Sequence, residues 1–201
     1  MNFKTIIVFL LFCGCTGCVN IVKWRYGIKN PAEETPAKLI SFLEKHHFPD
    51  SCQYIFNDSG AYCTSLRNPL FKKNLLSHMI FDANGALIKH DTSQCQWSGY
   101  EVIRALNRDS AVIRDEAGHL NELLTLIHPL HGDQSAVAFE AEPDFTVVIT
   151  WAKFLGTYNA RLFDLARAAA LNNKSRIRLI FLNIDMQESW MLTKDQKMGI
   201  R

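Results

Sequence analysis

The second half of the chain contains two long apolar runs separated by an amphipathic stretch. Residues 145–151 are a near-continuous run of β-branched and aromatic side chains, which predicts a strand buried on both faces. Residues 160–171 are rich in alanine and leucine and end before Asn172, which predicts a helix. Residues 176–185 predict a second strand. Together these elements predict a β-α-β unit over residues 145–185, with a right-handed crossover between parallel strands.

An antiparallel hairpin is predicted over residues 78–90. Two apolar runs, 78–82 and 86–90, flank Asn84 and Gly85, and Asn-Gly supplies the positive φ angles of a tight hairpin turn. Apolar spacing and turn residues predict further elements: helices at 36–46, 69–76, 98–106 and 118–127, and a short strand at 53–56. Amphipathic helices of this kind need a sheet or a neighbour to cover their apolar face. The whole pattern predicts an α/β fold with a mixed sheet flanked by helices.

The first 18 residues have the pattern of an export signal. An apolar run at residues 6–12 follows a weakly basic start, and it is much shorter than the about 20 residues that cross a bilayer. The segment resembles a bacterial lipoprotein signal, in which a cysteine after a small residue becomes the lipidated N-terminus. Cys15 is the first candidate because the apolar run ends closest to it, and Cys18 is the alternative; each follows a glycine. A plain cleaved signal and an uncleaved anchor remain open as well.

This resemblance implies an N-terminal lipid with palmitate that holds the protein to the membrane of the cell envelope. No aspartate follows either cysteine, which by family analogy favours the outer membrane, on its periplasmic or surface side. Residues 19–36 end in a polar, proline-bounded stretch at 30–36, which predicts a tether before a folded domain at 37–201. The composition, 48% hydrophobic and 21% charged, is that of a globular domain. A net charge of +2 is too small to indicate nucleic acid or an anionic membrane surface as the main partner.

Three cysteines lie beyond the export signal: Cys52, Cys63 and Cys95. An odd number permits at most one internal disulfide, and export makes that bond chemically possible. Cys52 and Cys63 are the first candidates for it, since they flank a short loop-like stretch. None of the three cysteines lies in a C-x-x-C spacing.

The β-α-β unit resembles the envelope-anchored thiol–disulfide oxidoreductases, whose fold is thioredoxin-like. In that family a strand runs into Trp-Ala-Thr-Trp-Cys-x-x-Cys, then a helix, then a strand that ends near an acidic residue. The corresponding positions here are Trp151, Ala152, Phe154, Leu155 and Tyr158. The tryptophan and alanine match, the phenylalanine replaces the second aromatic residue, and Leu155 and Tyr158 hold the two cysteine positions. Asn183-Ile184-Asp185 matches the end of the second strand.

The resemblance implies a thioredoxin-like mixed sheet, possible in two arrangements. A thioredoxin fold also has an antiparallel hairpin and a closing helix, which normally follow the β-α-β unit. Here the hairpin at 78–90 and the helix after it precede that unit, so the preferred arrangement is a single sheet with permuted element order. The alternative is a separate half-domain at 37–107 packed on an incomplete second half. The family's cis-proline before the hairpin is absent, because Leu76 and Ser77 precede His78.

Thiol–disulfide exchange needs a thiolate at a helix N-terminus and a second thiol that resolves the mixed disulfide. Leu155 and Tyr158 supply neither. The sequence therefore favours a non-catalytic module, without a cofactor, that binds an unknown envelope protein or peptide through the surface from Trp151 to Tyr158. The enzyme alternative is a divergent oxidoreductase or redox chaperone using Cys95 or Cys63. A secreted accessory protein beside a peptide-export or modification system is a third hypothesis.

Two other sets of residues could form sites, but the sequence favours structural roles for both. A metal bound by His128 and His131 with Cys95, or with His46 and His47, has only a Pro-Leu spacer in its favour. The tryptophans that might line a ligand groove are Trp97, Trp151 and Trp190, for which packing is the stronger interpretation. The chain has no phosphate-binding loop, dinucleotide fingerprint or nucleophile elbow.

Overall fold

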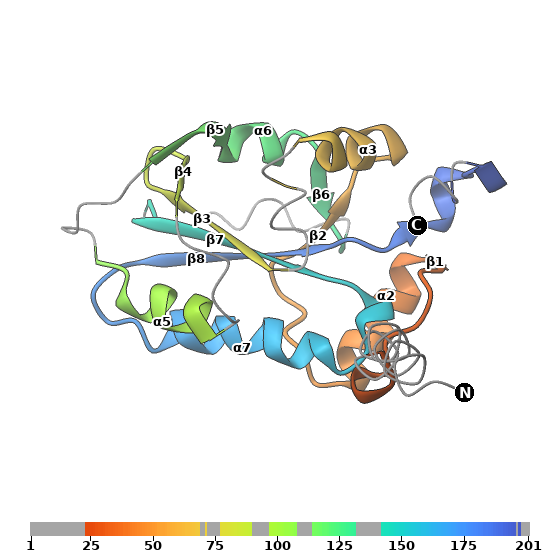
Figure 1. Ribbon diagram of the computed structural model, residues 1–201, viewed down its shortest axis with the longest axis horizontal. Coiled ribbons are helices and arrows are strands. Elements are labelled where there is room, and N and C mark those ends of the chain that lie inside the picture. Colours follow the sequence, from red (N-terminus) through yellow and green to blue (C-terminus); the bar gives the residue numbers. More distant parts are fainter. Residues whose placement is uncertain are drawn as a thin grey trace, which may run out of the picture.

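The computed structural model describes residues 23–68, 71, 77–89, 97–107, 114–131, 142–195 and 197. Within these residues a mixed seven-stranded sheet lies between two layers of helices (Figure 1). The predicted export signal with Cys15 and Cys18, and also Cys95, lie outside the described residues. No helix in the described part of the chain has the length and apolar character needed to span a membrane.

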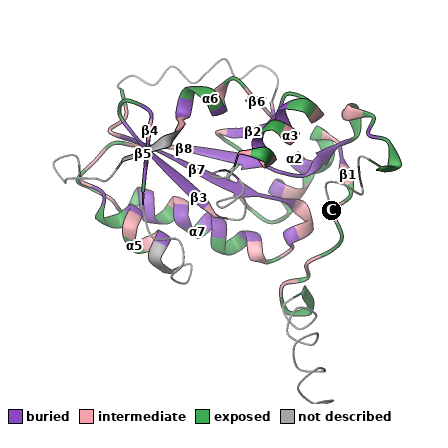
Figure 2. Ribbon diagram, turned by 45° about the horizontal axis from the view of Figure 1, so that its top comes forward, coloured by how far each residue is buried: buried purple, intermediate pink, exposed green. Residues whose placement is uncertain are grey.

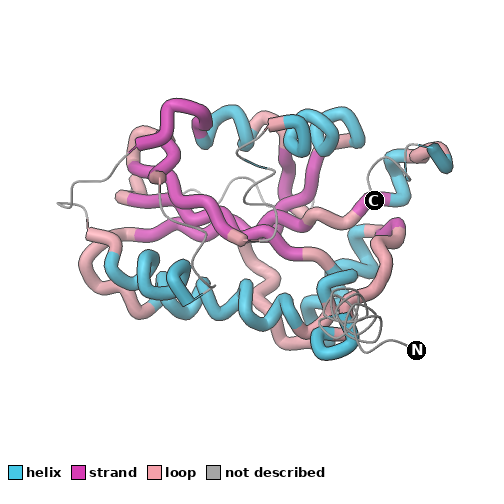
Figure 3. Tube along the Cα trace, in the orientation of Figure 1, coloured by secondary structure: helices cyan, strands magenta, loops and turns pink. Residues whose placement is uncertain are grey.

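The main sheet contains β2 (Gln53–Phe56), β3 (His78–Asp82), β4 (Ala86–Ile88), β5 (Arg114–His119), β6 (Ile127–Pro129), β7 (Phe145–Trp151) and β8 (Ile177–Asn183). The helices are α2 (Pro36–Lys45), α3 (Ser59–Arg67), α5 (Trp97–Ala105), α6 (Leu120–Leu124) and α7 (Tyr158–Ala170). A separate two-stranded sheet pairs β1 (Glu33–Glu34) with β9 (Met186–Gln187), and short 3₁₀ turns occupy Lys153–Leu155 and Glu188–Trp190. Figure 3 shows how these helices and strands follow one another along the chain.

The strand order of the main sheet is β5-β4-β3-β7-β8-β2-β6. β7 and β8 are parallel along their whole length, from Phe145 opposite Ile177 to Trp151 opposite Asn183, and α7 connects them. β3 runs antiparallel on the other side of β7. The hairpin and the β-α-β unit therefore share one sheet, and their order along the chain is that of the permuted arrangement.

Helices cover both faces of the sheet. α2, α5 and α7 lie on one face, and α3 and α6 lie on the other (Figure 1). Every residue of β7 is buried, as its continuous apolar run predicts for a central strand (Figure 2). α7 presents an apolar face to the sheet, with Leu162, Leu165 and Ala168 buried. Full burial of such a leucine stabilises the fold by about 1.5–3 kcal/mol.

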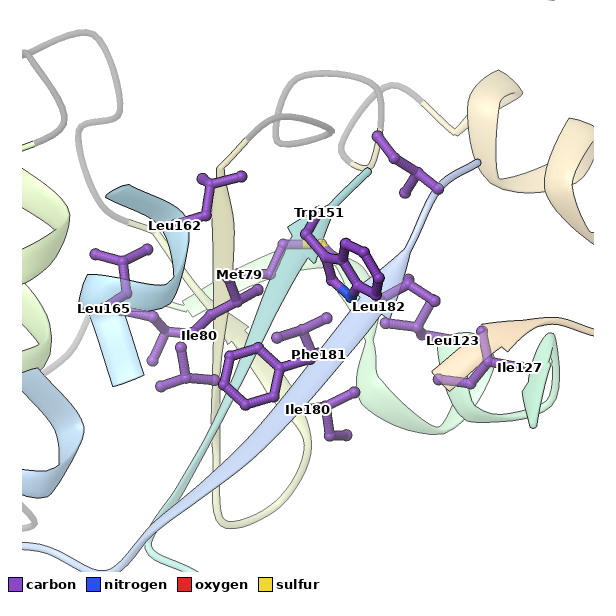
Figure 4. Packing of buried hydrophobic residues seen from close by; sticks show 14 of the residues in the cluster. Met79, Ile80, Leu123, Ile127, Trp151, Leu162, Leu165, Ile180, Phe181 and Leu182 are labelled. Atoms are coloured by element: carbon purple, nitrogen blue, oxygen red, sulfur yellow. The ribbon is translucent and has the colours of Figure 1, made fainter. Parts of the chain in front are cut away.

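Trp151, at the end of β7, is a centre of this packing. Its side chain is fully buried, and its ring lies 6.0 Å from that of Phe42 and 5.9 Å from that of Phe163, measured between centroids. Figure 4 shows buried side chains of β3, β7, β8 and α7 gathered around it. For this tryptophan the packing interpretation is confirmed, because no part of the ring reaches a groove.

The sequence patterns do not predict α3, β5 or β6. Residues 57–60 are predicted as a loop, yet Asp58 begins α3 by accepting a hydrogen bond from the backbone N–H of Ala61 at 2.8 Å. β5 is polar in sequence and is a strand because it pairs with β4 at the sheet edge. The helix predicted at 118–127 is shorter, because its ends belong to β5 and β6. Most of the helix predicted at 69–76 lies outside the described residues.

Asn172, in the turn after α7, holds the end of α5 against this layer. Its Nδ2 donates to the carbonyl oxygens of Ile103 at 2.9 Å and Leu106 at 2.8 Å. Its Oδ1 accepts from the backbone N–H groups of Lys174 at 2.8 Å and Ser175 at 3.1 Å. One side-chain amide therefore donates to carbonyl oxygens at the end of α5 that have no partner within the helix. The same amide also accepts hydrogen bonds that shape the turn into β8.

We predict that Asn172→Ala lowers the free energy of unfolding by about 1–3 kcal/mol, because these backbone groups lose their partners. The neighbouring Asn173 is exposed and its side chain makes no hydrogen bond to the described residues, so Asn173→Ala should change stability by less than about 0.5 kcal/mol. Equilibrium denaturation in urea measures both variants. Equal losses in the two would contradict a capping role for Asn172.

Candidate functional site

The carboxyl ends of β7 and β8 lie at the same edge of the sheet, because the two strands are parallel. In open α/β sheets this edge is where ligands usually bind. Here the chain leaves β7 at Trp151, passes through residues 152–157, which we call the β7–α7 loop, and enters α7 at Tyr158. β8 ends at Asn183 beside this loop.

Asp185 is a buried carboxylate below the β7–α7 loop. Its side chain is 1% exposed, and Oδ2 accepts hydrogen bonds from the backbone N–H of Lys153 at 2.6 Å and from Nδ2 of Asn183 at 2.8 Å. The pKa of Asp185 is raised to about 6, mainly by desolvation and to a smaller extent by the negative charge of Glu34, while the hydrogen bonds that the carboxylate accepts oppose both effects. The carboxylate orients the loop at the energetic cost of a buried charge.

Asn159, in the first turn of α7, closes the β7–α7 loop from the other side. This residue is fully buried, and its Nδ2 donates to the carbonyl oxygens of Ala152 at 2.8 Å and Gly156 at 3.0 Å. Its Oδ1 accepts from the backbone N–H of Ala152 at 3.3 Å. One side-chain amide thus satisfies three buried backbone groups of the loop, which fixes the entry into α7.

The residues predicted as a tether contact the domain closely from residue 23 onward. We call residues 23–34 the N-terminal strap. The carbonyl oxygen of Tyr26 accepts hydrogen bonds from the backbone N–H of Thr157 at 2.9 Å and from its hydroxyl at 3.1 Å. The backbone N–H of Lys29 donates to the carbonyl oxygen of Phe154 at 2.8 Å. A polar, proline-bounded sequence is equally compatible with a solvated tether and with a strap whose backbone pairs with a neighbouring loop.

Ion pairs and a glycine complete the contact between strap and loop. Glu34 pairs with Lys153 and Glu33 pairs with Lys197, each at 2.7 Å, while β1 pairs with β9. Gly156 has a positive φ of 56°, and a Cβ there would overlap the carbonyl oxygen of Tyr26. Only glycine therefore permits this close approach of the strap backbone.

The sequence predicts that five residues, at the positions resembling the redox loop of thioredoxin-like oxidoreductases, form a binding surface. In the structure most of these residues are covered. Trp151 and Ala152 are fully buried, and Leu155 is buried at 3% exposure. Phe154 and Tyr158 are half-buried, and the ring of Tyr158 packs edge-on against Tyr26 at 5.5 Å between centroids. The strap covers much of this surface, which a pattern local to residues 151–158 does not reveal.

The two described cysteines lie away from the β7–α7 loop. Cys52 and Cys63 are half-buried free thiols, so the disulfide expected between them is not formed in this structure. Cys63 belongs to α3, on the sheet face opposite α7 (Figure 1). Cys52 precedes β2, and its carbonyl oxygen accepts from the backbone N–H of Phe181, upstream of the end of β8. Burial raises the pKa of the Cys52 thiol, which keeps it protonated and poorly nucleophilic.

A cleft of about 750 Å³ opens beside the β7–α7 loop. Its walls are the N-terminal strap, the exposed face of α2 and the loop itself. Its charged lining residues are Lys29, Lys38, Lys45, Lys153 and Glu34. The sequence analysis misses this cleft because three separate segments form it. The only local signal is the exposed stripe on α2, where lysines and a serine recur at helical spacing.

His46, His128 and Trp190 have packing or hydrogen-bonding neighbours. His46 stacks on Phe42 at 4.5 Å between ring centroids, and Nδ1 of His128 lies 3.0 Å from Oδ1 of Asn57. Trp190 packs on Tyr62 at 5.3 Å. Across the described ranges, no group of three or more metal-ligating side chains comes together.

No family model matches the chain, and neither a curated protein nor a solved structure was found to be similar to it.

We predict that Asp185→Asn removes part of the pH dependence of stability. The pKa of Asp185 lies near 6 in the folded state and near 3.8 in the unfolded chain, so the folded state holds the proton more tightly. Stability is therefore greatest below about pH 4 and falls as the pH rises through about 6, by about 3 kcal/mol for this group. In the Asp185→Asn variant this decrease in stability with rising pH should be absent.

Urea denaturation at a series of pH values measures this effect. Asp164→Asn on the exposed face of α7 is the matched control, and it should keep the fall in stability of the unmodified protein. A pH dependence in Asp185→Asn equal to that of the control would contradict a charged, desolvated carboxylate at this position.

Proposed function

We propose that this protein is a non-catalytic binding or assembly module of the cell envelope that binds an envelope protein, peptide or smaller ligand at the cleft beside the β7–α7 loop. The observation that carries the proposal is the cleft itself. It lies at the ligand-binding edge of a parallel β-α-β unit, and its walls come from three segments held together by named hydrogen bonds and ion pairs. A preformed concave surface of this size favours binding.

Among the residues that the structure describes, no thiol pair lies at this edge. The positions of the two family cysteines are a buried leucine, Leu155, and a tyrosine packed against the strap, Tyr158. The described thiols lie on other elements, and the backbone N–H of Thr157 at the start of α7 already donates to Tyr26. One of the backbone donors at the start of α7 is therefore already used by the strap. These features support binding rather than dithiol catalysis.

We further propose that the fold is a permuted thioredoxin-like fold. The support is topological: β3 and β4, the hairpin that normally follows the β-α-β unit in that family, pair with each other, and β3 pairs antiparallel with β7 in the same sheet. The helix after the hairpin, α5, packs against α7. On this proposal the cleft occupies the side of the molecule where the relatives hold their redox centre.

We predict that the full chain does not reduce insulin disulfides with dithiothreitol as the electron source. The Cys63→Ala and Cys95→Ala variants should behave like the unmodified protein in this assay. Thiol titration should find that the cysteines react slowly and independently of one another. Insulin reduction is followed by turbidity, with a C-x-x-C thioredoxin as the positive control. Reduction that Cys95→Ala or Cys63→Ala abolishes would contradict the proposal and establish a divergent oxidoreductase or redox chaperone.

We also propose that the chain is a lipoprotein anchored through Cys15, in the outer membrane of a two-membrane cell. The support is the short apolar run before a glycine and a cysteine, and the polar residues that follow. One acyl chain alone binds membranes only marginally, so a multiply acylated cysteine is the chemistry that would hold the protein there.

We predict that mass spectrometry of the mature protein finds a diacylglyceryl-modified cysteine at its N-terminus. Cys15→Ser should abolish the modification, while Cys18→Ser should leave it unchanged. The reverse result would move the anchor to Cys18. A mature protein that begins with free Met1 would contradict lipidation altogether.

A further inference from the structure

The cleft beside the β7–α7 loop concentrates positive charge. The whole chain has a net charge of only +2, yet the cleft is lined by four lysines and one glutamate. Lys153 is neutralised by Glu34 at 2.7 Å. The other three lysines, Lys29, Lys38 and Lys45, form no ion pair with any described carboxylate.

These three lysines come from two walls of the cleft. Lys38 and Lys45 lie two turns apart on the exposed face of α2, about 10 Å along the helix axis. Lys29 belongs to the N-terminal strap, whose position is fixed by its backbone hydrogen bond to Phe154. Because the strap and α2 are separately anchored, one cleft is lined by three lysines that no described carboxylate neutralises.

Neutral hydrogen-bond donors and apolar surface accompany the lysines. Ser41 lies between the lysines on α2, and Asn30 follows Lys29 on the strap, so a hydroxyl and an amide also line the cleft. Phe42 and Phe154 add apolar surface. A volume of about 750 Å³ is far larger than a single phosphate ion and fits a ligand with an anionic group and a further body.

We propose that this cleft binds a phosphate-bearing ligand, with Lys29, Lys38 and Lys45 around the phosphate groups. Lysine binds phosphate as a point charge with three donors, and separated lysines suit a ligand with more than one anionic oxygen group. The inference rests on the proposed function, because it names a ligand class for the same surface. A soluble phosphate compound and the headgroup of an anionic lipid share this chemistry.

The test is isothermal titration of the full chain, in non-ionic detergent, with two probes. Inorganic pyrophosphate represents a soluble ligand, and short-chain phosphatidylglycerol represents an anionic lipid headgroup. Short-chain phosphatidylcholine is the net-neutral control, because its choline cation balances the charge of its phosphate. Saturable binding of pyrophosphate alone indicates a soluble ligand. Binding of phosphatidylglycerol alone, or of both probes, includes the lipid headgroup. All three results support the site, whereas saturable binding of neither probe overturns it, as does equal binding of phosphatidylcholine and phosphatidylglycerol.

Two double variants locate the binding. Lys38→Gln with Lys45→Gln should weaken it by at least about tenfold. Lys89→Gln with Lys174→Gln removes the same charge from exposed lysines outside the cleft, and should leave the affinity within about twofold. Equal weakening in both would show general attraction to a basic protein and would overturn the site.

Lysine acetylation of the unmodified protein, followed by mass spectrometry, gives a result that does not depend on any variant folding. The bound probe should slow acetylation of the three cleft lysines relative to Lys89 and Lys174, and uniform acetylation rates would overturn the proposal. The insulin assay separates the two levels of inference. Absence of phosphate binding leaves the non-catalytic module standing, whereas cysteine-dependent insulin reduction refutes the module whatever the cleft binds.

Discussion

Buried backbone groups at the end of β7 need hydrogen-bond partners, and the rest of the site depends on how this need is met. The chain must turn from a fully buried tryptophan, Trp151, into a helix without exposing the core. Asn159 pairs the amide and carbonyl groups of Ala152, and Asp185 accepts from the backbone of Lys153. An unpaired buried backbone group costs as much as a lost hydrogen bond, so these two polar side chains stabilise the turn.

The position of the N-terminal strap follows from this turn. Once the β7–α7 loop is fixed, its outward backbone groups at Phe154 and Thr157 are available to residues 23–34, and Gly156 leaves room for the strap backbone. The strap in turn forms one wall of the cleft that α2 completes. A cleft thus arises beside the β7–α7 loop, and much of its lining comes from chain that precedes β2.

The elements with strong local patterns were predictable from the sequence. The continuous apolar runs of β7 and β8, the Asn84-Gly85 turn and the proline-led α2 match the structure closely, because local spacing and turn chemistry specify them. β5 and β6 were not predictable, since each is a short strand whose identity comes from its partner in the sheet. The sequence could not show that the predicted surface from Trp151 to Tyr158 is mostly buried, because this depends on a segment more than 100 residues earlier.

The sequence by itself determined the α/β class and the crossover unit, because local apolar spacing and turn residues specify both. Only the tertiary structure decided that the hairpin joins the same sheet, that Cys52 and Cys63 stay apart, and that three unpaired lysines share one cleft. The physical reason is that local charge density and burial depend on which residues the fold brings together in space. A net charge near zero averages over the whole surface, whereas a fold brings distant cations together and buries distant neighbours.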